Sequence, residues 1–306
     1  MTGAKAQPGA GAEPGTEAEA GAGAEPGQTV LRVGTWNLAS GRGPDGRPTS
    51  AAVLAEAVRA LEVDVLAVQE LDRHQARSGA LDQLAVVAEA LDAVESRFVA
   101  TLAGLPGPGR AWQAVLGEDV PDGPSYGIGL VSRLPVLDWR VCQLGGSRAA
   151  LPMAVPGPPR GRHRVVLVPD EPRAAVAAVV DAPGGPVTVV STHLSFAPPV
   201  AARQLRALRS WVGTLPAPVV VAGDLNLPGR VPVWLTGWRA LASGPTYPAA
   251  APRVQLDHLL LAARDGVGPG GRAAATTGPA GRISDHLPVH AVLPTRRWFT
   301  RRPPPW

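Results

Sequence analysis

A run of apolar residues in the second half of the chain, VVVAGDLNLP at 219–228, leads directly into Asp224 and Asn226. A buried strand can stop in any turn, but these two polar residues lie two positions apart and can project from one side of the strand end. A carboxylate and an amide placed in this way suit a site for a metal ion or a phosphate group. Such a site needs further members from other parts of the chain.

Five other apolar segments also end in, or carry, polar side chains suited to metal or phosphate chemistry. They contribute Asn37, Glu70, His193, Asp257 with His258, and Asp285 with His286. Placing a carboxylate or an imidazole beside a buried strand is costly unless the group is paired or binds a metal. Each case alone has a structural explanation, but six together predict a common site at one edge of the sheets.

Carboxylates are prominent in this predicted site, and they indicate which metal it would hold. Glu70, Asp224 and Asp285 offer hard oxygen ligands, and Cys142 is the only cysteine, so Mg²⁺ or Mn²⁺ suits the site better than zinc. Water is the expected nucleophile, because no serine or cysteine lies in a nucleophile elbow and no P-loop glycine pattern occurs. These groups fit the metal-assisted hydrolysis of a phosphate ester.

The amides and histidines of the predicted site have different uses. Asn37 and Asn226 can bind a metal or hold a phosphate oxygen without adding negative charge. His193 and His286 can move protons near neutral pH or stabilise developing charge. The residue types therefore supply both a binding function and a proton-transfer function.

Asp257 and His258 are neighbours on one expected strand, so their side chains face opposite sides of it. Only one of the two can enter the site. We expect Asp257 to fix the tautomer of a catalytic histidine and His258 to be structural.

Hydrophobic periodicity predicts an α/β domain with two packed sheets and helices outside them. Strands are expected at 29–38, 63–70, 97–102, 126–132, 164–168, 174–180, 187–193, 219–224, 254–261 and 286–293. Helices are expected after a Ser50 cap, over 81–91 and over 200–213. The Pro-, Gly- and Arg-rich stretch 143–172 is expected to be an elaborated surface loop around the strand 164–168, with arginines open to solvent or to an anionic substrate.

Both ends of the chain differ from the predicted domain, which we place at residues 30–294. Residues 1–29 consist mainly of Gly, Ala, Glu and Pro and are predicted to be disordered, because they offer no apolar surface to bury. Residues 295–306 form a basic, Pro-rich tail that holds four of the arginines behind the net charge of +4. Since the remaining arginines are scattered, this charge is a weak indication of a nucleic-acid partner.

Location and assembly can also be predicted. The N-terminus has no apolar segment typical of a secretory signal, and no run of eighteen apolar residues occurs. A lone cysteine forms no internal disulfide and fits a reducing compartment. We therefore expect a cytoplasmic protein, monomeric and without an obligate protein partner, that acts on a phosphate-ester substrate.

Seven short motifs follow one another along the chain: TWN (35–37), QE (69–70), YGIGLVSR (126–133), STHL (191–194), GDLN (223–226), LDHLLL (256–261) and SDH (284–286). Taken in order, they resemble the motifs of the endonuclease/exonuclease/phosphatase superfamily. Each is weak alone, but the ordered set spans nearly the whole predicted domain. The resemblance implies a four-layer α/β sandwich with the site at one end of two central sheets.

The resemblance also implies a role for each motif residue. Glu70 would be the principal Mg²⁺ ligand with Asn37 beside it, and Asp285 would join the metal shell. His286, oriented by Asp257, would polarise the attacking water or stabilise the phosphoryl oxygens.

The remaining motif residues would handle the water and the phosphate. Asp224 and Asn226 would position them, and His193 would bind the scissile phosphate or assist the leaving group. Whether Asp224 or His286 is the general base stays open at this point.

Three functional classes follow from the sequence. The first is a Mg²⁺-dependent phosphodiesterase, nuclease or phosphatase. The second is a catalytically silent protein that binds phosphoesters through a metal, and the third is a nucleic-acid-binding module that acts through the basic tail. The loops that set substrate choice do not follow from pattern, so nucleic acid, phospholipid headgroup and phosphorylated small molecule all remain open.

Overall fold

A computed structural model describes residues 29–43, 46–105, 112–117, 121–147, 150–157, 162–262, 273–275 and 283–295. The predicted disordered segment 1–29 and basic tail 295–306 lie outside these residues, apart from one residue at the border of each. None of the described helices is long and apolar enough to cross a bilayer.

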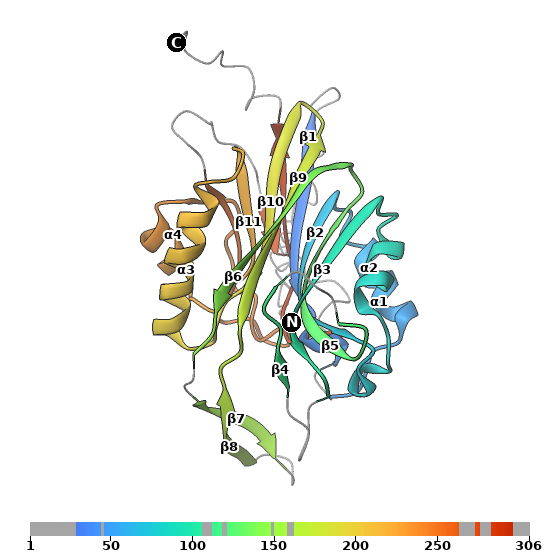
Figure 1. The fold of residues 1–306 in the computed structure, drawn as a ribbon, viewed down its shortest axis with the longest axis vertical. Coiled ribbons are helices and arrows are strands. Elements are labelled where there is room, and N and C mark those ends of the chain that lie inside the picture. Colours follow the sequence, from blue (N-terminus) through green and yellow to red (C-terminus); the bar gives the residue numbers. More distant parts are fainter. Residues whose placement is uncertain are drawn as a thin grey trace, which may run out of the picture.

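The first sheet joins strands from both ends of the chain, in the order β14-β15-β1-β2-β5-β3-β4. These strands are β1 (Val30–Asn37), β2 (Val65–Arg73), β3 (Glu95–Ala103), β4 (Gln113–Ala114), β5 (Ser125–Ser132), β14 (Ala273–Ala275) and β15 (Val289–Pro294). Helices α1 (Ala51–Arg59) and α2 (Gln83–Ala90) cover its outer face (Figure 1). Their apolar side chains pack there with those of β1, β2, β3 and β5.

The second sheet has the order β12-β13-β11-β10-β9-β6. Its strands are β6 (Val136–Gly145), β9 (Arg173–Ala182), β10 (Gly185–His193), β11 (Val219–Asp224), β12 (Arg239–Ala240) and β13 (Asp257–Ala262). Helices α3 (Pro198–Val212) and α4 (Val231–Thr236) cover its outer face, on the opposite side of the molecule from α1 and α2 (Figure 1).

The two sheets face each other across a buried apolar layer. Alternate residues of β9, such as Val176 and Val180, meet residues of the first sheet such as Val33 and Leu130 in one cluster. Because β9 and β10 are covered on both faces, they read as near-continuous apolar runs in the sequence. The predicted four-layer α/β sandwich is confirmed.

Helix starts follow the local chemistry that the sequence suggests. The Ser50 hydroxyl accepts a hydrogen bond from the Val53 amide at the start of α1, as predicted. Asp82 caps α2 in the same way through the Ala85 amide. At the start of α3 proline occupies the first turn, where its missing amide hydrogen costs nothing.

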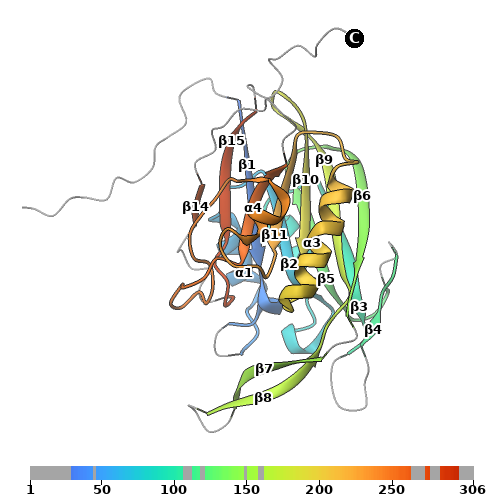
Figure 2. The same cartoon turned by 90° about the vertical axis from the view of Figure 1, so that its left-hand side faces the viewer.

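The stretch 143–172 corrects the prediction of a surface loop, although it contains the strand predicted at 164–168. The β6 strand continues to Gly145, and β7 (Ala150–Gly157) and β8 (Arg162–Pro169) then form an antiparallel hairpin. This hairpin extends away from the lower end of the sandwich (Figure 2). Its prolines hide the pairing in the sequence, because a two-stranded ribbon tolerates proline at edge positions that a central strand excludes. Arg148 and Arg160 lie outside the described residues.

Two parallel strand pairs organise one end of the sandwich. The pair β1 and β2 is joined through α1, and the pair β10 and β11 is joined through α3. Parallel strands end at the same edge, so the carboxyl ends of all four strands can carry one site. Short 3-10 turns at Ala39–Gly41 and Ala76–Ser78 follow β1 and β2.

Candidate active site

The site begins with residues that strand register places side by side. Asn37 ends β1 and pairs with Gln69 of β2, while His193 ends β10 and pairs with Asp224 of β11. The Gln69 side chain donates to the Ser191 hydroxyl at 3.4 Å and so links the two sheets behind the site. The two parallel pairs thus bring their ends together.

Glu70 projects from a bulge in β2. The pairing of β2 with β5 shifts between Val68 and Leu71, and Glu70 has the left-handed backbone angle φ 53°. A bulge re-aims a side chain without ending the strand, and β2 continues here to Arg73. The predicted strand end at Glu70 is therefore wrong by three residues, because alternation cannot reveal an inserted residue.

Asn37 connects the two halves of the site. Its amide nitrogen donates to Glu70 Oε1 at 3.1 Å and to Asp224 Oδ2 at 3.0 Å, while its amide oxygen accepts from the Ala39 amide. The Asn37 side chain is fully buried. A carboxylate from each sheet is thus held by one amide group.

The GDLN turn that follows β11 has a defined local structure. Asp224 Oδ1 accepts from the Asn226 amide at 2.9 Å, a local bond that favours the left-handed φ of 50° at Asn226. Gly223 allows β10 to lie close, since a Cβ atom at this position would be 1.9 Å from the Thr192 carbonyl oxygen. The turn therefore needs each of its three polar or small residues.

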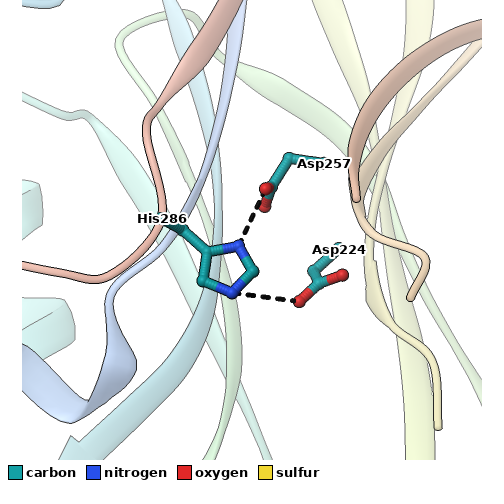
Figure 3. A group of neighbouring side chains, drawn as sticks. All are labelled: Asp224, Asp257 and His286. Carbon is teal, nitrogen blue, oxygen red and sulfur yellow. Dashed lines mark hydrogen bonds and ion pairs between the residues drawn. The ribbon is translucent and has the colours of Figure 1, made fainter. Parts of the chain in front are cut away.

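His286 lies between two aspartates of the second sheet, as Figure 3 shows. Its Nδ1 is 2.8 Å from Asp257 Oδ2, and its Nε2 is 3.8 Å from Asp224 Oδ2. Burial alone would lower the pKa of His286, but the charges of Asp257, Asp224 and Asp285 and the bond to Asp257 outweigh burial and raise it to about 10. His286 is therefore an imidazolium at neutral pH, oriented by Asp257.

Asp224 is almost completely buried between the two histidines. Burial raises its pKa to about 7, and the Asp257 charge acts in the same direction. The His286 charge and the hydrogen bonds from Asn226 and Asn37 oppose this rise. Asp224 is thus a carboxylate that can accept a proton near neutral pH.

His193 is the second histidine beside Asp224, with its Nε2 3.6 Å from Asp224 Oδ2 and 3.2 Å from Asn226 Nδ2. Its Nδ1 is 3.0 Å from a guanidinium nitrogen of Arg173. Burial, Arg173 and His286 together lower its pKa well below 6.5. His193 is therefore neutral, in contrast to His286.

A cavity of about 200 Å³ lies beside Glu70. Arg77 on its wall is fixed by two bonds to Asp72, at 2.8 and 2.7 Å, and its guanidinium lies over the rings of Trp112 and Tyr126. The cavity is lined by Ser40, Arg42, Glu70, Arg77, Trp112, Tyr126, Glu171, Arg173 and Phe196. The space next to the carboxylate centre thus combines guanidinium groups with aromatic rings.

Of the predicted site residues, those now linked by direct contacts are Asn37, Glu70, His193, Asp224, Asn226, Asp257 and His286. Asp285 directly precedes His286 in the chain and is half-buried. Its charge helps to raise the pKa of His286 and of Tyr247. His258 is buried on the other side of β13, where its ring nitrogen Nε2 donates to the Leu227 carbonyl at 2.9 Å.

Sequence reasoning missed two side chains at this site. Arg173 is the first residue of the alanine-rich strand β9, and a charged residue just before an apolar run is typical of the end of a surface loop. The Tyr247 ring packs against the His286 ring, with centroids 4.9 Å apart, although it lies in an irregular segment with no periodic pattern. Only their contacts with histidines identify them.

The cluster of Asp224, Asp257 and His286 also has the composition of a metal site, with ligand atoms within 4.8 Å of one another. Two atoms of this cluster that could serve as ligands, His286 Nδ1 and Asp257 Oδ2, already bond to each other. Glu70, in contrast, is half-buried, borders the cavity and has only one described hydrogen bond to its carboxylate. The hard carboxylate oxygens of Glu70 suit a divalent cation such as Mg²⁺.

Comparison with known proteins gives a consistent result. The profile of the Endonuclease/Exonuclease/phosphatase family matches residues 34–286. No curated protein sequence matches the chain. An endonuclease/exonuclease/phosphatase from Beutenbergia cavernae has a similar solved structure, with 24% identity and a TM-score of 0.61, covering 87% of this chain and 72% of that one.

Two further solved structures share the fold at lower identity. The mannosyl-6-phosphatase Bt3783 of Bacteroides thetaiotaomicron is 15% identical with a TM-score of 0.53, covering 85% of this chain and 98% of its own. A D. rerio TDP2 complexed with a single-strand DNA product is 17% identical with a TM-score of 0.50, covering 86% and 98%.

Proposed function

Because the chain belongs to the endonuclease/exonuclease/phosphatase family, we propose that it is a Mg²⁺-dependent hydrolase of phosphate esters in which water attacks phosphorus in line. Family members are phosphoester hydrolases. The observation that carries the proposal for this chain is the continuous set of contacts from Glu70 through Asn37 and Asp224 to His286 and Asp257. It joins the ends of both sheets into one catalytic array.

Glu70 and Asp285 are the residues that would hold the metal, with Mn²⁺ as the alternative ion. Both are half-buried carboxylates, and Glu70 borders the cavity. When bound, the ion would neutralise charge on the phosphoryl oxygens. Asn37 holds Glu70 through its amide nitrogen, so its predicted ligation of the metal would require the amide to turn. A positioning role for Asn37 fits the observed bonds better.

Asp224 is the group best placed to take the proton from the attacking water. His286 already carries its proton, because Asp257 binds its Nδ1 and stabilises the charged ring. His193 has its Nδ1 facing the Arg173 guanidinium and its Nε2 directed toward Asp224. Asp224, with a pKa raised to about 7, accepts the proton in its ionised form, and Asn226 holds the turn that positions it.

The histidines serve the phosphate rather than the water. The His286 imidazolium lies within reach of the carboxylate that binds the water, so it can stabilise the charge that develops on the phosphoryl oxygens. His193 offers a neutral N–H to the phosphate or to the leaving group. These assignments give the proton acceptor and the oxyanion donors separate side chains.

The test is a metal-supplemented screen with matched variants. We expect hydrolysis of bis-p-nitrophenyl phosphate, p-nitrophenyl phosphate, single-stranded DNA or sphingomyelin in the presence of Mg²⁺ or Mn²⁺, and its loss in EDTA. The variants Glu70→Ala and His286→Ala should lower kcat by about 100-fold or more with unchanged circular dichroism.

Two results would contradict the proposal. Hydrolysis that persists in EDTA would exclude a metal requirement, and wild-type rates in either variant would remove the assigned site. Metal-dependent binding of a phosphoester without turnover would instead identify a silent binding protein. The panel contains a phosphomonoester and DNA because the similar structures include a mannosyl-6-phosphatase and a DNA complex.

A further inference from the structure

Arg173 makes an unusual contact with a catalytic histidine. It is the first residue of β9, only 5% of its surface is exposed, and a terminal nitrogen of its guanidinium lies 3.0 Å from His193 Nδ1. Its other terminal nitrogen lies 3.6 Å from Glu171 Oε2. Its Nε is buried without a hydrogen-bond partner among the described residues. The shortest contact of the buried guanidinium is therefore the one with His193, and its remaining donors are poorly satisfied.

The contact determines which ring nitrogen of His193 carries the hydrogen. A guanidinium has five N–H donors and no acceptor, so the atom facing it must present a lone pair. A neutral imidazole has one lone pair and one N–H. With the lone pair at Nδ1, the hydrogen must lie on Nε2.

The surroundings of Nε2 contain one acceptor and one donor. Asp224 Oδ2 lies 3.6 Å away as an acceptor, whereas the Asn226 amide nitrogen, 3.2 Å away, is also a donor. One of the two N–H groups of that amide donates to the Leu194 carbonyl at 3.0 Å. The opposite tautomer would direct Nδ1–H at the charged Arg173 group, a donor facing a donor in a buried place. Because the guanidinium is charged and lies closer, whereas the amide is neutral, the Arg173 contact dominates over the Asn226 contact.

We propose that Arg173 is a positioning residue that fixes the Nε2–H tautomer of His193, so that this histidine acts only as a neutral hydrogen-bond donor to the phosphate and never as the general base. This inference rests on the proposed phosphoester hydrolysis. It distinguishes His193 from His286, whose Nδ1 faces the Asp257 carboxylate instead. A histidine held by a carboxylate gains a proton, and one held by a guanidinium keeps a single N–H in a fixed direction.

The first experiment reads the tautomer without any substrate. Long-range ¹H–¹⁵N spectra of the full-length protein should show His193 with a pyrrole-type Nε2 and a pyridine-type Nδ1, assigned by comparison with His193→Ala. In Arg173→Met the ring should move toward a mixture of tautomers or a changed protonation state. A protonated Nδ1 in the wild-type protein would overturn the proposal, whether or not a substrate has been found.

The second experiment tests whether Arg173 acts through His193. Arg173→Met should lower kcat by about 10- to 100-fold with KM changed less than about threefold, and Arg173→Lys should recover part of the loss. In a His193→Ala background, Arg173→Met should cause little further loss, because the group it positions is gone. Equal losses in both backgrounds would overturn the proposal.

A matched control separates this effect from the general loss of an arginine. Arg203→Met removes an exposed guanidinium that donates to the Gly146 carbonyl, and it should leave kcat unchanged. If Arg173→Met does not fold, the wild-type spectrum and Arg173→Lys still decide the matter. If no substrate of the screen is hydrolysed, the proposed function fails while the tautomer measurement still tests Arg173.

Discussion

Two histidines flank the carboxylate of Asp224, and their Nδ1 atoms face groups of opposite charge. His286 faces Asp257 at 2.8 Å, and His193 faces the Arg173 guanidinium at 3.0 Å. The charge of Asp257 raises the pKa of His286, whereas burial, together with the charge of Arg173, lowers the pKa of His193. The neighbouring groups thus make one histidine a charged ring and keep the other a neutral hydrogen-bond donor.

The Asp257 carboxylate can be tested by removing its charge while keeping an acceptor. Asp257→Asn should lower the pKa of His286 and reduce kcat by about 100-fold, because the ring loses the charge that stabilises its protonated form. The neighbouring variant His258→Gln is the control, since His258 faces away from the site and bonds the Leu227 carbonyl. Steady-state kinetics on the best substrate of the screen would show the difference; equal rates for the two variants would place Asp257 outside the mechanism.

At the scale of elements, two parallel strand pairs and one bulge position the site. Apolar runs predicted most of the strands correctly, because strands buried on both faces leave a strong signal. The half-exposed strand β6 was not predicted, since polar and apolar residues alternate irregularly along it. The bulge at Glu70 and strand β7, with its pairing to the predicted strand at 164–168, were also missed, because each depends on pairing with other segments or on tolerated prolines.

Gly223 tests how closely the elements must approach. Gly223→Ala should destabilise the protein by about 2–3 kcal/mol, because its Cβ would lie 1.9 Å from the Thr192 carbonyl oxygen and push β10 away from β11 at the site. Gly123→Ala, where a Cβ meets nothing within 4 Å, should have little effect. Urea denaturation of both variants would give the two free energies of unfolding. A stable Gly223→Ala protein would mean that the strands can separate there without cost.

At the scale of the whole molecule, the sequence was sufficient for the sandwich and for the list of residues now in contact, because motif residues stand out where apolar strands end. The sequence did not identify residues that belong to the site only through a contact with another side chain. Arg173 belongs to the site because it contacts His193, and Tyr247 because its ring packs against His286. Neither contact follows from periodicity, since each joins segments that only the folded sheets bring together.

The pH dependence of stability offers a test of the packed interior that needs no substrate. Burial lowers the pKa of His258 below 6.5, so the unfolded chain binds a proton at a higher pH than the folded chain does. The stability that neutral His258 contributes is therefore present above pH 6.5 and is lost as the pH falls below it, by about 1.4 kcal/mol for each unit of pKa difference. His193 acts in the same direction, whereas Asp224, with a pKa raised to about 7, acts in the opposite one.

A single substitution isolates the contribution of His258 from these opposing groups. His258→Gln keeps a donor for the Leu227 carbonyl and cannot take up a proton. When the pH is lowered from 7.5 to 5.5, the free energy of unfolding of this variant should therefore rise by about 1 kcal/mol relative to that of the wild-type protein. His74→Gln, at an exposed position, should show no such change. Urea denaturation followed by tryptophan fluorescence at the two pH values would measure both. A constant difference for His258→Gln would show that the buried ring accepts a proton without cost, and that water reaches the interior of the second sheet.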